Sequence, residues 1–180
     1  MALRLFASTP DCSRKVLFLF AAEIRADRLG YAVFELPQKF IDFGAASFDS
    51  PVTAKPRITR LLRIFRPSLL ILRKPDARRR QQALASRMVA KAARSESRRL
   101  AIPIVYVSAR TSRKYYQRYS CRNKYDVAAL LSDWYPDIAW RLPKKRKFYG
   151  PEPRVMIYFD SAALAAVHLG IAEGGRTKSP

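Results

Sequence analysis

The order of strand-like and helix-like segments is the feature that most narrows the folds open to this chain. Residues 16–24, 31–36 and 39–48 are rich in apolar and aromatic side chains and are separated by short turns. Three such segments in succession indicate an antiparallel meander, because short turns join neighbouring strands that run in opposite directions. From residue 54 onward the apolar residues change to helical spacing, which ends the meander.

After the meander, helical segments alternate with short apolar runs. The expected elements are a helix over 54–66, a strand over 68–72, a helix over 77–100, a strand over 102–107, and helices over 109–119, 123–134 and 161–169. Uninterrupted apolar runs of this kind are typical of strands that are buried on both faces. We therefore predict an α/β fold, in which three antiparallel strands and two helix-linked parallel strands form a five-stranded mixed sheet flanked by helices.

The chain length suits one domain of ordinary size. We expect residues 1–14 to form a flexible leader, residues 15–171 a single domain, and residues 172–180 a flexible tail. Cys12 and Cys121 are too few for a disulfide framework or a thiolate zinc site. The sequence permits one disulfide bond between them, but two free thiols in a cytoplasmic protein are the simpler interpretation. His168 is the only histidine, which argues against histidine-based catalysis.

The charge of the chain points to its partners. Thirty-five Lys and Arg residues against 14 Asp and Glu residues give a formal net charge of +21. So strong a positive field attracts polyanions, with nucleic acid first and an anionic membrane surface second. Fourteen of the basic residues lie between Arg57 and Arg99, together with only two acids, so salt bridges along the helices cannot neutralise them. No apolar run is long enough to span a bilayer.

Two basic stretches are candidates for phosphate contact. Three arginines near a predicted helix start favour phosphate binding there, and a run of cations next to Phe148 and Tyr149 suits a nucleic-acid strand with exposed bases. The candidate nucleic-acid-binding residues are Arg73, Lys74, Arg78, Arg79, Arg80, Lys144, Lys145, Arg146 and Lys147.

Three short motifs follow one another along the chain. The acidic Glu23 ends the first strand, Gly30-Tyr31 opens the second, and Asp160 precedes a run of small and apolar residues at the start of the last helix. In order and spacing these motifs resemble the RuvC-type branch of the ribonuclease H-like superfamily, the Holliday junction resolvases and their relatives. The resemblance spans roughly residues 16–170. It implies a Mg²⁺-dependent (alternatively Mn²⁺-dependent) endonuclease that acts on structured or branched nucleic acid, DNA before RNA, and a homodimer.

The resemblance also implies which residues form the site. Glu23 and Asp160 would be metal ligands, and Glu152 a third catalytic carboxylate, with Asp27 as its alternative. Two-metal hydrolysis needs several carboxylates that converge on Mg²⁺. Where the family has a Glu at the end of the fourth strand, this chain has Arg73, whose guanidinium cannot bind a cation.

Each of these carboxylates also has an interpretation that involves no metal. Glu23 could be a strand-end charge, Asp160 a helix N-cap, and Glu152 a partner of Arg154. With Glu152 or Asp27 in place of the missing carboxylate the site is rearranged, and without either it is degenerate. A degenerate site would leave a catalytically inactive nucleic-acid-binding module of the same fold, or a basic accessory subunit of a nucleic-acid-processing assembly.

Overall fold

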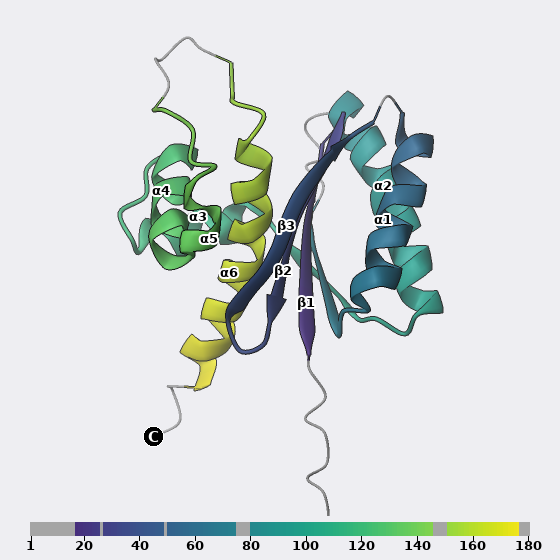
Figure 1. Ribbon diagram of the computed structural model, residues 1–180, viewed down its shortest axis with the longest axis horizontal. Helices are drawn as coiled ribbons and strands as arrows, with labels where there is room; N and C mark the ends of the chain where they lie inside the picture. The colour runs from purple at the N-terminus through teal and green to yellow at the C-terminus, as the bar shows by residue number, and fades with distance from the viewer. Residues whose placement is uncertain (1–16, 26, 49, 75–79, 146–150, 177–180) are drawn as a thin grey trace, which may run out of the picture.

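A five-stranded mixed sheet runs through the molecule (Figure 1). The computed structural model describes residues 17–25, 27–48, 50–74, 80–145 and 151–176. The strands are β1 (Phe18–Ile24), β2 (Arg28–Glu35), β3 (Lys39–Ser47), β4 (Leu69–Arg73) and β5 (Ile104–Val107), in the spatial order β3-β2-β1-β4-β5. The first three pair antiparallel, while β4 runs parallel to β1 and β5 parallel to β4. The predicted sheet is confirmed.

Helices cover both faces of this sheet, as predicted (Figure 1). One face carries α1 (Pro51–Phe65) and α2 (Arg80–Arg99). The other face carries α6 (Met156–Arg176), and α3 (Ala109–Gln117), α4 (Lys124–Trp134) and the short α5 (Pro136–Ala139) lie beyond it. Helix α5 lies in a stretch that the sequence predicts as loop. Among the described residues, no helix is long and apolar enough to cross a bilayer.

The core has two apolar layers, one on each side of the sheet. Successive residues of β1 alternate between them: Leu19 and Ala21 pack on the α6 side, whereas Phe20 and Ala22 pack on the α1 and α2 side. This alternation follows from the two-residue period of a strand. It also sends Glu23, the next odd-numbered residue, to the α6 side of the sheet.

Helix α6 lies very close to β2, and Gly30 makes that approach possible. A Cβ atom at this position would lie 2.7 Å from the Ile157 side chain and 2.8 Å from the Ser161 hydroxyl. Gly30 is also the cross-strand partner of Glu23. The glycine in the Gly30-Tyr31 motif therefore allows α6 to pack beside the end of β1.

The bounds of α6 differ from the prediction. The sequence predicts a helix over 161–169 that starts near Asp160 and ends at Gly170, but the helix begins at Met156 and continues to Arg176. Gly170 is needed for packing, because a Cβ atom there would collide with the Tyr115 ring of α3. The predicted tail boundary at residue 172 falls inside this helix, whereas residues 177–180 and the predicted leader 1–14 lie outside the described residues.

Candidate functional site

Parallel pairing of β1 and β4 brings Glu23 and Arg73 together. Ala22 is in register with Leu72, so the next residue of each strand lies at the same edge of the sheet. The Arg73 Nε donates to Glu23 Oε2 at 3.0 Å, and its Nη1 donates to the buried Ser112 hydroxyl at 3.1 Å. The side chains of Glu23 and Arg73 are only 13% and 23% exposed. Arg73 is therefore a partner of the Glu23 carboxylate, anchored to α3.

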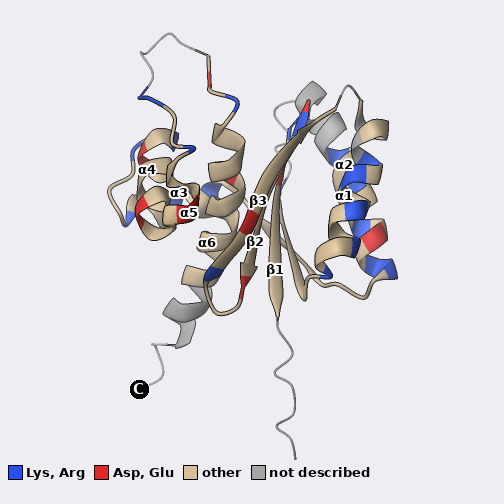
Figure 2. Cartoon of the chain, viewed as in Figure 1, with Lys and Arg blue, Asp and Glu red and all other residues tan. Residues whose placement is uncertain are grey.

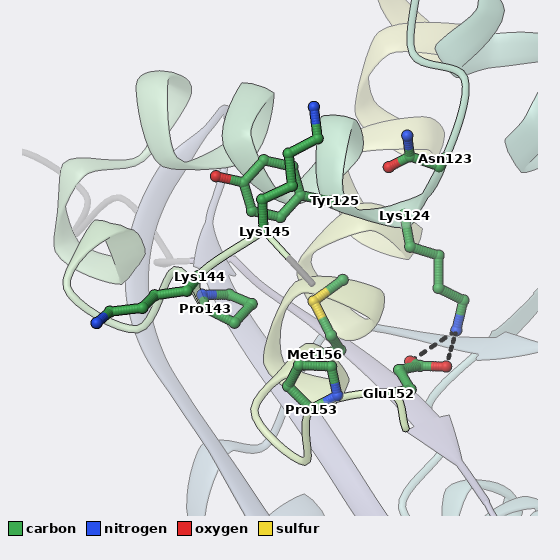
Figure 3. Close-up of a pocket in the computed structure, with 9 residues that line it drawn as sticks. All are labelled: Asn123, Lys124, Tyr125, Pro143, Lys144, Lys145, Glu152, Pro153 and Met156. Carbon is green, nitrogen blue, oxygen red and sulfur yellow. Dashed lines mark hydrogen bonds and ion pairs between the residues drawn. The ribbon is translucent and has the colours of Figure 1, made fainter. Parts of the chain in front are cut away.

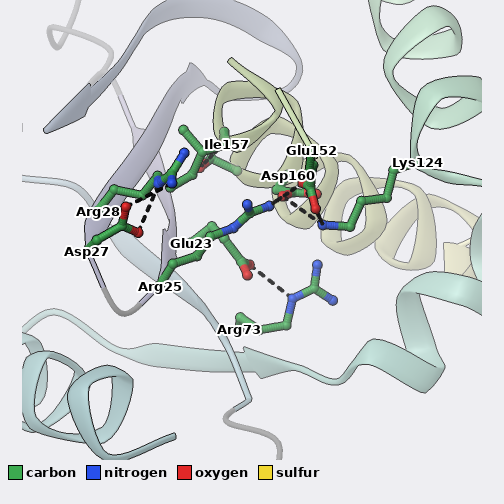
Figure 4. A network of polar contacts seen from close by, with 10 residues as sticks. Glu23, Arg25, Asp27, Arg28, Arg73, Lys124, Glu152, Ile157 and Asp160 are labelled. Carbon is green, nitrogen blue, oxygen red and sulfur yellow. Dashed lines mark hydrogen bonds and ion pairs between the residues drawn. The ribbon is translucent and has the colours of Figure 1, made fainter. Parts of the chain in front are cut away.

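Two further carboxylates meet beside this pair (Figure 4). Asp160 projects from the second turn of α6, and Glu152 comes from the segment that precedes the helix. Arg25 forms ion pairs with both carboxylates, at 2.7 Å from Glu152. The Lys124 ammonium, at the start of α4, lies 3.0 Å from Glu152 and 3.3 Å from Asp160. Arg25 and Lys124 thus both bridge the same two acids.

The cluster is balanced in charge, and we call it the ion-pair cluster. It consists of the carboxylates of Glu23, Glu152 and Asp160 and the cations Arg25, Arg73 and Lys124. Burial raises the pKa of Glu23; Arg73 opposes this shift, and the nearby Asp160 charge adds to it. Burial works against ionisation of Glu152 as well, but hydrogen bonds and charges from Arg25 and Lys124 outweigh it and lower its pKa.

The three carboxylates predicted from sequence are therefore brought together, but their arrangement does not fit a Mg²⁺ site. Mg²⁺ needs free carboxylate oxygens in an octahedral arrangement. Here Arg25 and Lys124 bridge Glu152 and Asp160, and Arg73 binds Glu23. Within the part of the chain that the structure describes, no three His, Cys, Asp or Glu side chains are grouped so that they could hold a metal ion.

The other acidic candidate lies apart from this cluster. Asp27, the alternative to Glu152, is 58% exposed and pairs with its neighbour Arg28 at 2.8 Å. Glu152 pairs with Arg25 and Lys124 in the structure, where the plainer interpretation had expected Arg154 as its partner. Asp160 lies inside α6 and is not its N-cap, because the helix starts four residues earlier.

The predicted phosphate-binding residues occupy several places. Lys74 is exposed just after β4, and Lys144 and Lys145 are exposed in the segment before Glu152. Arg80 begins α2. Arg78, Arg79, Arg146 and Lys147 lie outside the described residues.

Many Lys and Arg residues lie along α1 and α2, on the face of the sheet opposite α6 (Figure 2), and most of them are exposed. We call this surface the basic face. Its exposed members are Lys55, Arg57, Arg60 and Arg63 of α1, Arg66 at the C-cap of α1, and Arg87, Lys91, Arg94, Arg98 and Arg99 of α2. The acid that joins the two helices is the buried Glu96, which binds Arg63 at 2.8 Å and Arg99 at 2.6 Å. These hydrogen bonds, Arg99 first, lower the pKa of Glu96 to about 2.

Two members of the ion-pair cluster, Arg25 and Lys124, are not among the residues predicted from the sequence. Arg25 follows Glu23 by two residues, and the period of a strand puts such a pair on one face, so a signal was available. Lys124 is separated from its partners by 28 and 36 positions, and nothing in its local sequence marks it.

Solved structures of Holliday junction resolvases share this fold. RuvC of T. thermophilus in complex with a Holliday junction substrate matches with a TM-score of 0.64 at 14% identity, over 88% of this chain and 96% of that one. The yeast mitochondrial resolvase Ydc2 gives a TM-score of 0.57 at 11% identity, over 84% of this chain and 78% of that one. The Fowlpox virus resolvase with junction DNA gives 0.56 at 13% identity, over 85% and 99%.

The chain therefore has a ribonuclease H-like fold of the RuvC type, as the sequence motifs predict. No family model matches the sequence, and no curated protein matches it. At identities this low the likeness establishes the fold alone.

Proposed function

We propose that this chain is a nucleic-acid-binding module of the RuvC-type fold. It binds structured or branched nucleic acid without cutting it, with DNA as the first candidate and RNA as the alternative. This proposal rests on the ion-pair cluster. Each of the three carboxylates in this cluster is bound by Arg or Lys, and the cations come from β4, from α4 and from the residue that follows β1. Lys and Arg donate hydrogen bonds and have no lone pair for a metal, so they compete with a divalent cation for the same oxygens.

The charge distribution supports the binding part of this proposal. The basic face offers cations on two neighbouring helices, and Lys74, Lys144 and Lys145 add exposed charges elsewhere. Phosphate contacts supply most of the sequence-independent affinity of nucleic-acid-binding proteins. Branched DNA is the first substrate to test, because two of the structural neighbours were solved with Holliday junctions.

A Mg²⁺-dependent endonuclease is the second candidate function. The observation that favours it is the convergence of Glu23, Glu152 and Asp160 on one small region (Figure 4). In this candidate, Arg25, Arg73 and Lys124 would have to leave the carboxylates before a metal could bind. Metal binding would then break the ion pairs that these three cations form with the carboxylates. Because this loss opposes metal binding, the endonuclease is the second candidate.

The deciding experiment measures binding and cleavage on the same substrates. The protein is mixed with a four-way junction and with a duplex of equal length, with Mg²⁺, with Mn²⁺ and with EDTA. We expect binding that is independent of the divalent ion, and intact DNA in every lane. Cleavage that requires the metal and disappears in Asp160→Asn would establish the endonuclease instead. Failure to bind any of these substrates would favour the accessory-subunit interpretation.

The same samples test the homodimer that the resemblance implies. Sedimentation of the protein alone and with the junction gives the number of chains in each species. Two chains per junction would support the proposed dimer, because a junction has two-fold symmetry.

A further inference from the structure

A pocket of about 480 Å³ lies beside the ion-pair cluster (Figure 3). Three segments line it: the start of α4, the stretch that follows α5, and the segment that leads into α6. The lining residues are Asn123, Lys124, Tyr125, Pro143, Lys144, Lys145, Glu152, Pro153 and Met156. Its size is within the range of small-molecule and cofactor sites. Lys124 and Glu152 belong to both the pocket and the cluster.

The lining has two chemistries. Tyr125, Pro143, Pro153 and Met156 supply flat or apolar surface, and Tyr125 contributes an aromatic ring (Figure 3). Lys144 and Lys145 are exposed and supply positive charge. An aromatic ring next to lysines is the combination with which proteins bind single-stranded nucleic acid, because every base has a face for stacking and every nucleotide has a phosphate.

The two ends of the pocket differ in charge. In Figure 3 the Lys144 ammonium and the Lys124–Glu152 pair lie on opposite sides of it. The Glu152 carboxylate is ionised at neutral pH, because Arg25 and Lys124 lower its pKa. It therefore balances the Lys124 charge at its end of the pocket and offers a hydrogen-bond acceptor to an amino group of a base. The phosphates flanking an inserted nucleotide are favoured beside the exposed ammonium groups of Lys144 and Lys145.

We infer that this pocket receives one unpaired base of the bound nucleic acid, with the base against Tyr125 and the flanking phosphates at Lys144 and Lys145. The inference rests on the proposed function and adds to it: the module recognises nucleic acid that carries an unpaired nucleotide. A fully paired duplex has no free base to insert, and extrusion of a base costs unpairing and unstacking energy. Bulges, loops and branch points offer such a base at low cost.

The test compares two duplexes that differ in one group. Each carries a single unpaired nucleotide at its centre; in one the nucleotide has a base (adenine), and in the other it is abasic. We expect the chain to bind the duplex with the base about tenfold more tightly, because stacking of one base on an aromatic ring is worth about that factor. This comparison uses the unaltered chain, so it does not depend on the folding of any variant.

Two substitutions at Tyr125 then locate the preference. Tyr125→Phe keeps the ring and is expected to keep the preference for the base, whereas Tyr125→Leu removes the ring and is expected to abolish it. Lys91→Ala on the basic face is the control, and it should weaken binding of both duplexes by the same factor. Circular dichroism of each variant confirms its helical content.

The outcomes separate this inference from the proposed function. Equal affinity for the two duplexes, or a preference that survives Tyr125→Leu, would overturn the base pocket and leave the nucleic-acid-binding module intact. Binding to neither duplex, nor to a junction, would overturn the proposed function as well.

Discussion

The guanidinium of Arg73 and the carboxylate of Glu23 bind each other across two neighbouring parallel strands, with 3.0 Å between Nε and Oε2. Both side chains are largely shielded from water, so each charge depends on the other. The pair holds the ends of β1 and β4 together at the point where a metal-dependent member of this fold would be expected to gather carboxylates. It is the reason to regard Arg73 as a structural partner and not as a free phosphate-binding group.

The first prediction concerns removal of this partner. Arg73→Ala leaves a buried carboxylate unpaired, and we expect it to lower the free energy of unfolding by about 2 kcal/mol at pH 7. Burial already raises the pKa of Glu23, and loss of Arg73 raises it further. A carboxyl whose pKa is higher in the folded state destabilises the fold as pH rises above its unfolded value.

The loss in Arg73→Ala should therefore be smaller at pH 4 than at pH 7. Urea unfolding at both pH values measures it, with Lys91→Ala as the surface control, for which we expect a change below about 0.5 kcal/mol. A loss that is the same at pH 4 and pH 7 would show that Glu23 does not respond to Arg73.

The second prediction is a gain of metal binding. Arg73→Glu changes the ion-pair cluster from three carboxylates and three cations to four carboxylates and two cations, which leaves a net negative site. We expect Mg²⁺ or Mn²⁺ to stabilise this variant, by about 2.7 kcal/mol when the metal is at a hundredfold excess over its Kd. Thermal unfolding with and without metal measures the effect.

The unaltered chain is the matched control for this gain, and its unfolding should not respond to metal. Equal stabilisation of both proteins would mean that metal displaces the native cations. Such a result would favour the endonuclease.

The architecture could be predicted because it is recorded in local patterns. Short apolar and aromatic runs separated by turns mark the strands, and the spacing of Ile58, Leu61 and Leu62 marks α1. The end of α6 could not be predicted in this way. Gly170 has the form of a helix terminator in the sequence, and only the packing of Tyr115 against α6 explains a glycine inside the helix.

The acidic half of the site was also predictable, and the basic half was not. Glu23 and Asp160 occupy places that the strand and helix order defines. Lys124 reaches them only because α4 packs on α6, a long-range contact with no local signal. The sequence therefore predicts that these carboxylates converge but leaves open what neutralises them, and their neutralisation by Arg and Lys determines the function we propose.

The third prediction tests the close approach of α6 to β2. Gly30→Ala would place a methyl group less than 3 Å from Ile157 and Ser161, so either the helix or the strand must move. We expect a loss of about 1–3 kcal/mol in the free energy of unfolding, the range for overpacked cores. Urea unfolding measures the loss, and an unchanged value would show that α6 shifts without cost.

The fourth prediction concerns the pH dependence of stability at the basic face. The pKa of Glu96 is about 2 in the folded chain, below its ordinary value near 4.5, through hydrogen bonds from Arg99 and Arg63. An acid whose pKa is lowered by folding stabilises the fold above its unfolded pKa, and this contribution is lost as pH falls from about 4.5 towards 2.

We therefore expect Glu96→Gln to be less stable than the unaltered chain at pH 6, with a difference that closes as the pH approaches 2. Melting temperatures at half-unit pH steps measure the two curves. A constant difference across this range would mean that the Glu96 charge contributes nothing and that only its packing matters.

The fifth prediction follows from the spacing of cations on α2. Arg87, Lys91, Arg94 and Arg98 recur at helical intervals on its exposed side, over a length of about 16 Å at 1.5 Å per residue. A row of this kind can contact several phosphates of one duplex.

If Lys91 contacts one of them, Lys91→Ala reduces the slope of log K against log salt by about 0.9 on duplex DNA. Lys39→Ala, which removes another exposed lysine at the start of the edge strand β3, should leave the slope unchanged. Fluorescence anisotropy across a salt series measures both slopes. Equal reductions in the two variants would mean that the duplex responds to the overall charge of the chain, whereas a reduction confined to Lys91→Ala places the phosphates on the basic face.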